Sequence, residues 1–530
     1  MAADASSPDT AHAHWRPSHN PWLVALTVTL ATFMEVLDTS IANVALPHIA
    51  GNLSASVDES TWVLTSYLVS NAIVLPLSGW LVMIFGRKRF YMACVAIFTV
   101  SSGLCGLASS LGMLVFFRIL QGVGGGGLQP SEQAILVDTF PARQRGMGMA
   151  VYGIAVVTAP IIGPTLGGWI TDNFSWRWIF FINIPVGLLS LFLTSRMVED
   201  PPYLTRKPLS QVRIDYVGFA LIALGLGALQ IVLDKGQRED WFASHFILIM
   251  SVIGGVALIA AIAWELHREE AMVELHLLKD RNFSLSVLLM FMLGVVLFGS
   301  TVLLPLFLQT LMGYNATLAG MALSPGGMVT MLSMPLVGLL LSRYDARWLV
   351  AFGIAMVSAG LFYMTRFNTQ IDFWTAATSR MIVAGGLGFL FVPINSIGYA
   401  YIRKEQRNQA SGLINLARNL GGSFGIALVT TLLARRAQVH QNMLVGHLTP
   451  YDPAYQNQLQ RTTSYLAAQT ADPVQAAQQA HGLMYAQLNQ QATMLAYLDC
   501  FMAMAVIFLA LLPVVFLVRK TVPGKDAPMH

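Results

Sequence analysis

Long apolar runs separated by short polar segments make up most of this chain. A helix needs about 20 apolar residues to cross a bilayer, and fourteen segments meet this requirement. They are residues 22–47, 60–84, 90–109, 112–138, 148–171, 178–197, 215–234, 245–266, 284–311, 317–341, 348–365, 373–399, 411–434 and 495–518. The pattern predicts an all-α polytopic membrane protein, and an even number of spans places both termini on the same side.

The composition supports this fold class and excludes others. Hydrophobic residues make up 55% of the chain and charged residues 11%, whereas soluble domains carry about 25% charged residues. The basic residues are dispersed among loops, so no nucleic-acid-binding surface is expected. The three cysteines have neither the spacing of a metal site nor that of a disulfide framework.

The distribution of basic residues predicts the orientation. With the N-terminus in the cytoplasm, 21 of the 31 lysines and arginines lie on the cytoplasmic side and seven on the other side. The remaining three, Arg118, Arg380 and Arg418, fall inside spans. Because cytoplasmic segments carry an excess of Lys and Arg, we expect both termini in the cytoplasm.

An internal repeat divides the spans into two sets. Pro76–Gly79 closes the second span as Pro335–Gly338 closes the tenth, and Arg118 and Arg380 each begin a glycine-rich span. Such pairs are separated by between 258 and 263 residues. Parallel six-span repeats are typical of secondary transporters whose binding site lies between the halves. We expect six-helix bundles at 22–197 and 284–518, a linker with two extra spans at 198–283, and terminal tails at 1–21 and 519–530.

The first span carries two acids, Glu35 and Asp38, at membrane depth. A charge there is costly unless it is paired, hydrated or protonated, so it marks a functional site. At about 1.5 Å per residue, Asp38 lies about 13 Å below the outer end of its span and Arg118 about 9 Å below the outer end of the fourth. Asp38 is therefore the expected partner of Arg118, with Glu35 one turn deeper on the same helix face.

The expected Asp38–Arg118 pair has two possible roles. It can load and release a proton, because burial favours a neutral carboxyl group and a nearby arginine favours the ionised one. A fixed structural ion pair is the alternative. Glu132, near the inner end of the fourth span, is either a second proton-coupling site or part of a hydrated cavity wall.

Residues 435–494 form a long segment outside the membrane that contains twelve glutamines. A disordered polar loop is one interpretation. Apolar residues at helical spacing in 454–468 and 474–490 favour instead short amphipathic helices that project beyond the membrane. An ordered insert of this size suits contact with a partner protein.

Several motifs resemble those of the major facilitator superfamily, specifically its fourteen-span drug:proton antiporter branch of EmrB-type exporters. Residues 37–47 read Leu-Asp-Thr-Ser-Ile-Ala-Asn-Val-Ala-Leu-Pro, similar to the first-span motif of that branch. Residues 118–122, Arg-Ile-Leu-Gln-Gly, resemble the arginine motif associated with proton transfer. Residues 159–168, Ala-Pro-Ile-Ile-Gly-Pro-Thr-Leu-Gly-Gly, resemble the fifth-span antiporter motif, and 233–242 match the branch's pattern after span seven. The resemblance covers essentially the whole chain.

The resemblance implies proton-coupled efflux of small hydrophobic or amphipathic compounds across the bacterial inner membrane. No cofactor is expected, since the chain has no nucleotide-binding loop and the proton gradient supplies the energy. EmrB-type pumps associate with a periplasmic membrane-fusion adaptor (EmrA-like) and an outer-membrane channel, and residues 435–494 are placed to contact such an adaptor. The alternatives are an exporter of a dedicated metabolite, such as a fatty acid or siderophore, and a polytopic membrane enzyme.

The fifth-span motif also has a physical interpretation. Gly163, Gly167 and Gly168 leave a flat helix face on which a neighbouring helix packs closely, while Pro160 and Pro164 bend the helix. This face is either a packing surface or the contact about which the two bundles rock.

The loop after the second span departs from the family pattern. Gly79, Gly86, Arg87 and Lys88 belong to a segment that resembles the superfamily's cytoplasmic gate motif, which usually has aspartate where Met83 stands. We therefore expect the motif's charge relay to a neighbouring helix to be missing. The basic residues would then serve mainly topology and lipid head groups.

The substrate cavity is expected between the two bundles near the middle of the membrane. The candidate wall residues are Asn43, Tyr67, Gln121, Phe307, Gln309, Phe391 and Asn395. The 26 methionines suit a surface that repacks around varied ligands.

Overall fold

The computed structural model describes residues 17–141, 143–204, 215–268, 271–446, 448–468 and 472–520. Most of both expected terminal tails and part of the expected linker lie outside these residues. Within them, fourteen helical segments are long and apolar enough to cross a membrane. The predicted number of spans is therefore confirmed.

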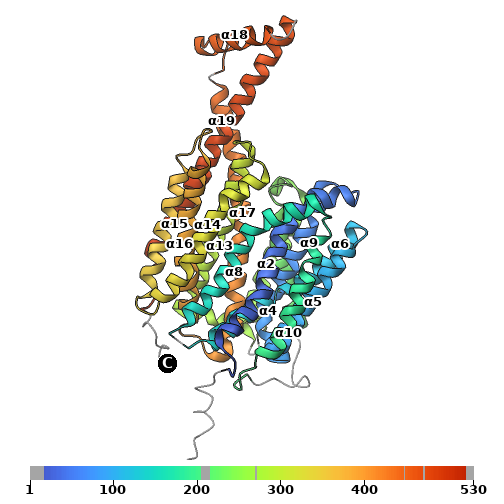
Figure 1. Cartoon of the computed structure of the whole chain (residues 1–530), viewed down its shortest axis with the longest axis vertical. Coiled ribbons are helices and arrows are strands. Elements are labelled where there is room, and N and C mark those ends of the chain that lie inside the picture. The colour runs from blue at the N-terminus through green and yellow to red at the C-terminus, as the bar shows by residue number, and fades with distance from the viewer. Residues whose placement is uncertain are drawn as a thin grey trace, which may run out of the picture.

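The helices form two bundles that lie side by side, with an inserted helix pair between them in the sequence (Figure 1). The first bundle consists of α2 (Pro21–Asn52), α4 (Trp62–Phe85), α5 (Arg87–Leu107), α6 (Leu111–Gly125) continued by α7 (Leu128–Thr139), α8 (Arg145–Asn173), and α9 (Trp178–Phe181) followed by α10 (Asn183–Met197). The inserted pair is α11 (Tyr216–Lys235) and α12 (His245–His267). The second bundle consists of α13 (Arg281–Thr310), α14 (Ala316–Leu340), α15 (Ala346–Met364), α16 (Phe373–Tyr399), α17 (Arg407–Val445) and α19 (Pro473–Leu509). The short helices are α3 (Val57–Ser60), α18 (Pro453–Ala467) and α20 (Leu512–Val515).

Local sequence explains where many helices begin. Ser110, Asp280, Asn315 and Asp372 each accept a hydrogen bond from a backbone N–H in the first turn of the helix that follows, which satisfies one of the free donors at a helix start. Gly86 joins α4 to α5 in a single residue with φ +83°, a conformation that glycine adopts without strain.

The chain direction defines two sides of the molecule. We call the side on which α2 begins and α4 ends the terminal side, and the opposite side, where α18 lies, the distal side (Figure 1). At the terminal side the bundles touch through glycines. A Cβ on Gly146 of α8 would lie 3.1 Å from the carbonyl oxygen of Gly338 of α14, and one on Gly79 of α4 would lie 2.7 Å from the Cα of Gln409 of α17. The backbones of the two bundles are thus in direct contact there.

The fifth-span motif packs α8 against α2. A Cβ on Gly163 would lie 2.5 Å from the Cβ of Ser40, whereas a Cβ on Gly168 would meet nothing within 4 Å. Pro164 has no N–H to bond the carbonyl of Pro160 one turn earlier, and that carbonyl accepts the Ser40 hydroxyl at 3.3 Å. The motif therefore supplies both the space and the free acceptor for a close helix contact.

The inserted pair is attached to both bundles through α11. The Gln230 and Ser423 side chains of α11 and α17 exchange hydrogen bonds of 2.8 and 3.2 Å. On the distal side, the Lys235 ammonium of α11 donates to the Thr61 hydroxyl beside α4. Helix α12 packs on the outside of α11 and is mostly exposed, as expected for a lipid-facing helix.

The segment 435–494 is helical, but it is arranged differently from the expectation. Helix α18 matches the predicted helix at 454–468, whereas the second predicted helix is not a short one. It is the first part of α19, which continues into the last span, and α17 likewise extends beyond its predicted end to Val445. These extensions carry α18 well beyond the bundles (Figure 1). Near their base, Asp499 of α19 accepts from Arg436 at 2.5 Å and lies 2.7 Å from His440, both of α17.

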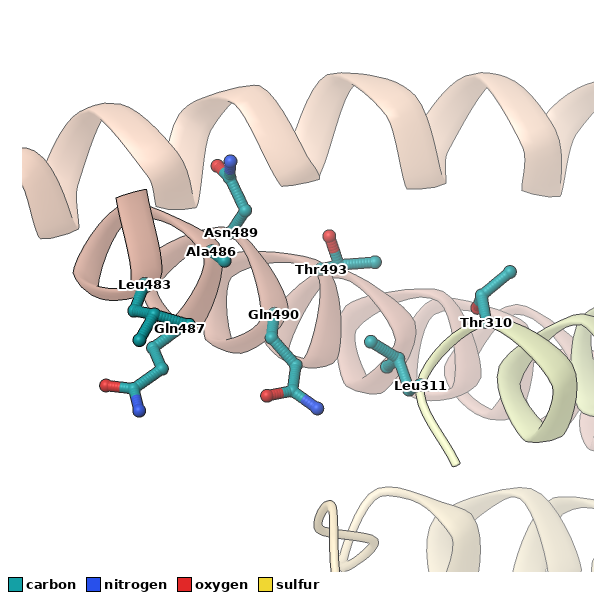
Figure 2. Close-up of a pocket in the computed structure, with 8 residues that line it drawn as sticks. All are labelled: Thr310, Leu311, Leu483, Ala486, Gln487, Asn489, Gln490 and Thr493. Carbon is teal, nitrogen blue, oxygen red and sulfur yellow. The ribbon is translucent and has the colours of Figure 1, made fainter. Parts of the chain in front are cut away.

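A polar groove lies where α19 leaves the second bundle. It has a volume of about 460 Å³ and is lined by Thr310 and Leu311 at the end of α13 and by Leu483, Ala486, Gln487, Asn489, Gln490 and Thr493 of α19 (Figure 2). The groove therefore opens on the distal side, outside the buried core.

Replacing Gly163 with alanine tests the α2–α8 contact. The added methyl group meets the Ser40 side chain at a distance that real contacts do not reach, so the helices must separate, at a cost of about 1–3 kcal/mol. We expect a lower melting temperature for the purified protein in detergent. Gly168→Ala, on the same helix and with open space at its Cβ, is the matched control. Equal melting temperatures for the two variants would contradict the close contact.

Candidate functional site: a buried acid cluster in the first bundle

Asp38 and Arg118 form an ion pair in the core of the first bundle. The Arg118 Nη1 lies 2.5 Å from Asp38 Oδ2, and both residues are buried. Asp38 Oδ1 accepts from the Asn183 amide at 2.7 Å and from the Gln121 amide at 3.0 Å. The partnership predicted from depth is therefore present, and Asn183 is a contributor that sequence reasoning missed.

Tyr67 joins this ion pair to Glu35. Its ring lies 4.4 Å from the Arg118 guanidinium carbon, and its hydroxyl donates to Glu35 Oε1 at 3.0 Å. Asn71 donates to the same oxygen at 3.2 Å, and Gln129 donates to Glu35 Oε2 at 2.6 Å. Glu35 thus receives only neutral donors, and Tyr67 contacts both Glu35 and the arginine that pairs with Asp38. A change of charge at either acid therefore alters the electrostatic environment of the other through Tyr67.

Glu132 has a poorer set of partners. It is fully buried in α7, and Thr29 of α2 donates to its Oε1 at 2.6 Å. No hydrogen-bond partner among the described residues reaches its Oε2, and no described basic side chain forms an ion pair with it. Both expected roles for Glu132, a proton site or a cavity wall, remain open.

A polar network connects Glu35 to the second bundle. Gln129, which donates to Glu35, accepts from the Arg418 guanidinium of α17. Arg418 also donates to the Tyr152 hydroxyl at 3.0 Å, and that hydroxyl donates to Asn415 at 3.1 Å. In the sequence, Arg418 is distinguished only as a charge inside a span. Its role was not predictable, because its partners come from helices far away in the sequence.

The second bundle lacks the acids of the first. Arg380, the repeat counterpart of Arg118, donates to Ser300 and Thr301 at 3.0 Å each. Ser300 lies as far along the repeat from Asp38 as Arg380 lies from Arg118. The second half therefore has an arginine, Arg380, at the position of Arg118, and a serine, Ser300, at the position of Asp38.

The terminal side contains a buried ion network that the sequence analysis did not expect. Arg87 of α5 lies 2.6 Å from Asp138 of α7, and Arg407 of α17 forms an ion pair with the same carboxylate. The expectation that Met83 removes the charge relay was wrong, because Asp138 supplies the carboxylate from a neighbouring helix. The Asp138 side chain is only 2% exposed. The network joins the two bundles, since Arg407 belongs to the second.

The same side places other gate-loop residues in protein contacts. The Lys88 backbone N–H donates to Asp200 and its ammonium donates to the Ser195 carbonyl, both at 2.7 Å. Tyr203, which follows α10, hydrogen-bonds to Asp138. Burial, and then the Asp138 carboxylate, raise the pKa of the Tyr203 hydroxyl above its ordinary value, so the phenol stays protonated and donates. Lys88 and Arg87 therefore hold protein groups together, in contrast to the expected role at lipid head groups.

The residues proposed for the cavity wall do not form one group. Tyr67 and Gln121 belong to the acid cluster, whereas Asn43 and Gln309 are exposed. Phe307 packs against Phe367 and Tyr497 inside the second bundle, with ring centroids 5.5 and 5.4 Å apart. The remaining two lie on α16: Phe391 packs against Tyr152 across the two bundles at 5.5 Å, and Asn395 is buried. A role for these residues in substrate binding stays a prediction.

Two six-helix bundles, the first with a buried charged cluster in its core, define a class of protein, the polytopic membrane transporters. Comparison with known proteins supports the assignment to the membrane transporters. A sequence model of the Major Facilitator Superfamily matches residues 28–426. The chain belongs to the major facilitator superfamily, and it is a membrane transporter and not an enzyme.

The relatives confirm the resemblance to EmrB-type exporters. The chain is 37% identical to the multidrug export protein EmrB of Escherichia coli (strain K12) over 95% of this chain and 97% of that protein. It is also 37% identical to the fatty acid resistance protein FarB of Neisseria gonorrhoeae over 94% of this chain and 96% of that protein. The structure of the proton:xylose symporter XylE aligns over 96% of this chain and 97% of that chain with a TM-score of 0.61 at 15% identity, which supports the fold.

Substituting Arg407 tests whether the terminal-side network holds the bundles together. Arg407→Gln leaves Asp138 bound only within the first bundle, and breaking such a buried pair is strongly destabilising to the contact. We expect a cysteine placed at the buried position Ala410 to react about tenfold faster with a membrane-impermeant thiol reagent, which corresponds to about 1.4 kcal/mol. Arg403→Gln, at a nearby exposed arginine, is the control. Equal labelling rates in the two variants would show that the network does not hold the two bundles together.

Proposed function

We propose that this protein exports small hydrophobic or amphipathic compounds in exchange for protons by alternating access. The observation that carries this proposal is the buried Asp38–Arg118 pair joined to Glu35 by Tyr67. Membrane-buried acids of this kind mark proton pathways. The similarity to EmrB over nearly the whole chain supports the export of drugs and other toxic compounds.

The proton cycle uses carboxyl groups whose partners change between conformations. Asp38 accepts hydrogen bonds from Arg118, Asn183 and Gln121 in the described state. Any rearrangement that draws Arg118 away favours proton uptake at Asp38. Glu35 and Glu132 are additional proton sites in this scheme, since neither is paired directly with a described basic residue. The gradient, and no bound cofactor, supplies the energy.

Alternating access requires the bundles to part on one side at a time. The glycine contacts and the Asp138 network close the terminal side in the described state. Helix α8 lies between α2 and α14, because its residues Ile161 and Thr165 face Gly327 and Gly320 of α14. The fifth-span motif, Pro160, Gly163, Pro164, Gly167 and Gly168, is thus placed to act as the rocking contact. The gate residues Gly79, Gly86, Arg87 and Lys88 would release the terminal side.

We place the protein in the bacterial inner membrane with the terminal side in the cytoplasm. The excess of lysines and arginines on that side supports this orientation. The distal side then faces the periplasm, and α18 with the extensions of α17 and α19 projects into it. A periplasmic EmrA-like adaptor, continued by an outer-membrane channel, is the partner we propose for this projection. The exposed aromatic side chains Tyr451 and Tyr465 fit such contact.

Export of a dedicated amphipathic metabolite is the second candidate. The equal identity to FarB, whose name refers to fatty acid resistance, favours this candidate. A panel of fluorescent dyes and medium-chain fatty acids, tested for competition with each other in everted vesicles, separates the two. Mutual competition supports a broad exporter, whereas transport of fatty acids alone supports the dedicated one.

Asp38→Asn tests the proton coupling. Asparagine cannot carry a proton and leaves Arg118 buried without a countercharge, so we expect loss of active dye efflux and of substrate-driven proton release in everted vesicles. Asp240→Asn, an exposed position with φ +57° that asparagine tolerates, is the control and should transport normally. Proton release by Asp38→Asn at the wild-type rate would contradict the proposal.

Replacing α18 tests the adaptor contact. A flexible Gly/Ser linker in place of Pro453–Ala467 removes the projecting helix and leaves the contact between α17 and α19 intact. We expect co-purification with an EmrA-like adaptor to fall by about tenfold, or about 1.4 kcal/mol, with unchanged dye efflux in vesicles that lack the adaptor. Tyr451→Ser with Tyr465→Ser should act in the same direction, and Tyr344→Ser, exposed on the terminal side, should have no effect. Unaltered adaptor binding without α18 would exclude this surface.

A further inference from the structure

Arg418 is a buried guanidinium whose countercharge does not come from its own bundle. It is 2% exposed, and helices α13 to α17 contain no aspartate or glutamate at all. Its partners are Gln129, Tyr152 and Asn419, all neutral. A buried cation without a carboxylate is costly unless a charge nearby compensates it. Such a charge exists across the interface between the bundles.

Glu35 is that charge, and Gln129 connects it to Arg418. The Gln129 amide donates to Glu35 Oε2 at 2.6 Å, and its carbonyl oxygen accepts from the Arg418 guanidinium. The positive NH2 end of the amide dipole therefore lies at the anion and the negative oxygen end at the cation, so each charge stabilises the orientation that the other needs. Gln129 acts as a bridge between an acid on α2 and an arginine on α17.

We propose that Arg418 is a positioning residue that transmits the protonation state of Glu35 to the contact between the two bundles. This inference rests on the proposed proton coupling. When Glu35 is ionised, the bridge through Gln129 holds α17 against the first bundle. When Glu35 is protonated, Gln129 faces a neutral group and Arg418 loses its countercharge, so the bridge weakens. Arg418 touches neither the proton nor the substrate in this scheme.

The position of the bridge fixes the direction of the effect. The Arg418–Tyr152 bond and the 2.9 Å Asn415–Gln133 bond also cross between the bundles, and the Asp138 network lies on the terminal side of both. All of these bonds must break for the bundles to part on the terminal side. Protonation of Glu35 therefore favours opening to that side, where a proton taken up from the distal side is released. This direction agrees with proton entry driving export.

Several other charged or titratable groups surround Glu35, and the test must separate them from Arg418. They are Tyr67 of α4, Glu132 of α7, Tyr152 of α8, Asp38 on the same helix, and Arg118 across the Tyr67 ring. Only Arg418 belongs to the second bundle. Arg380 offers a matched control, because it is equally buried in that bundle and bonds only to hydroxyl groups of α13.

The experiment compares Arg418→Gln, Arg418→Lys and Arg380→Gln in proteoliposomes, with the pH dependence of dye efflux as the readout. Removal of the positive charge favours the protonated form of Glu35, so the pH of half-maximal transport should rise by about one unit in Arg418→Gln. Arg418→Lys keeps the charge and should restore most of the wild-type profile. Arg380→Gln should keep the wild-type midpoint, whatever its maximal rate. The Glu35→Gln background should abolish the shift caused by Arg418→Gln.

A wild-type midpoint in Arg418→Gln would overturn the inference, as would an equal shift in Arg380→Gln. If Arg418→Gln does not fold, Gln129→Leu breaks the bridge and leaves both charges in place, and it should shift the midpoint in the same direction; no shift there would also overturn the inference. Absence of any substrate-driven proton movement in the wild-type protein would instead refute the proposed function. The two failures are therefore distinguishable.

Discussion

The cost of placing charges inside a membrane determines how the rest of this structure is arranged. Asp38 and Arg118 are tolerated because each neutralises the other and because Asn183, Gln121 and the Val63 carbonyl form further hydrogen bonds with them. These partners come from α4, α6 and α10, so the ion pair requires the first bundle to be fully assembled. Tyr67 then extends the cluster to Glu35. If a buried acid of this cluster changed its charge, the hydrogen-bond and ion-pair partners around it would have to rearrange.

The two halves of the chain differ in the charged residues that they carry inside the membrane. The first bundle holds Glu35, Asp38, Glu132 and Asp138, while helices α13 to α17 contain arginines and no acids. The second bundle therefore depends on the first for the countercharges of Arg407 and Arg418. This dependence places electrostatic attraction across the interface between the two bundles. Under the proposed function, proton uptake by an acid of the first bundle weakens this attraction.

Close backbone contact between helices is the second feature on which the arrangement depends. Glycines allow α8 to pack tightly against α2 on one face and against α14 on the other, and Pro164 frees the carbonyl that Ser40 binds. Interfaces that are packed to this density have few alternative arrangements. The distal projection is different, because α18 and the extensions of α17 and α19 lie beyond the bundles and expose polar and aromatic side chains.

The sequence by itself determined the number of spans, the two-bundle architecture, the family and the Asp38–Arg118 pair, because hydrophobic length and depth along a helix follow directly from residue order. The charge relay expected to be missing because of Met83 is present, and the roles of Asn183, Asp138 and Arg418 could not be predicted from the sequence. Their partners on other helices lie between 51 and 289 residues away in the chain. Such contacts depend on helix rotation and on how the bundles meet. Only the tertiary structure decided them, since a side chain's depth does not specify which neighbour it faces.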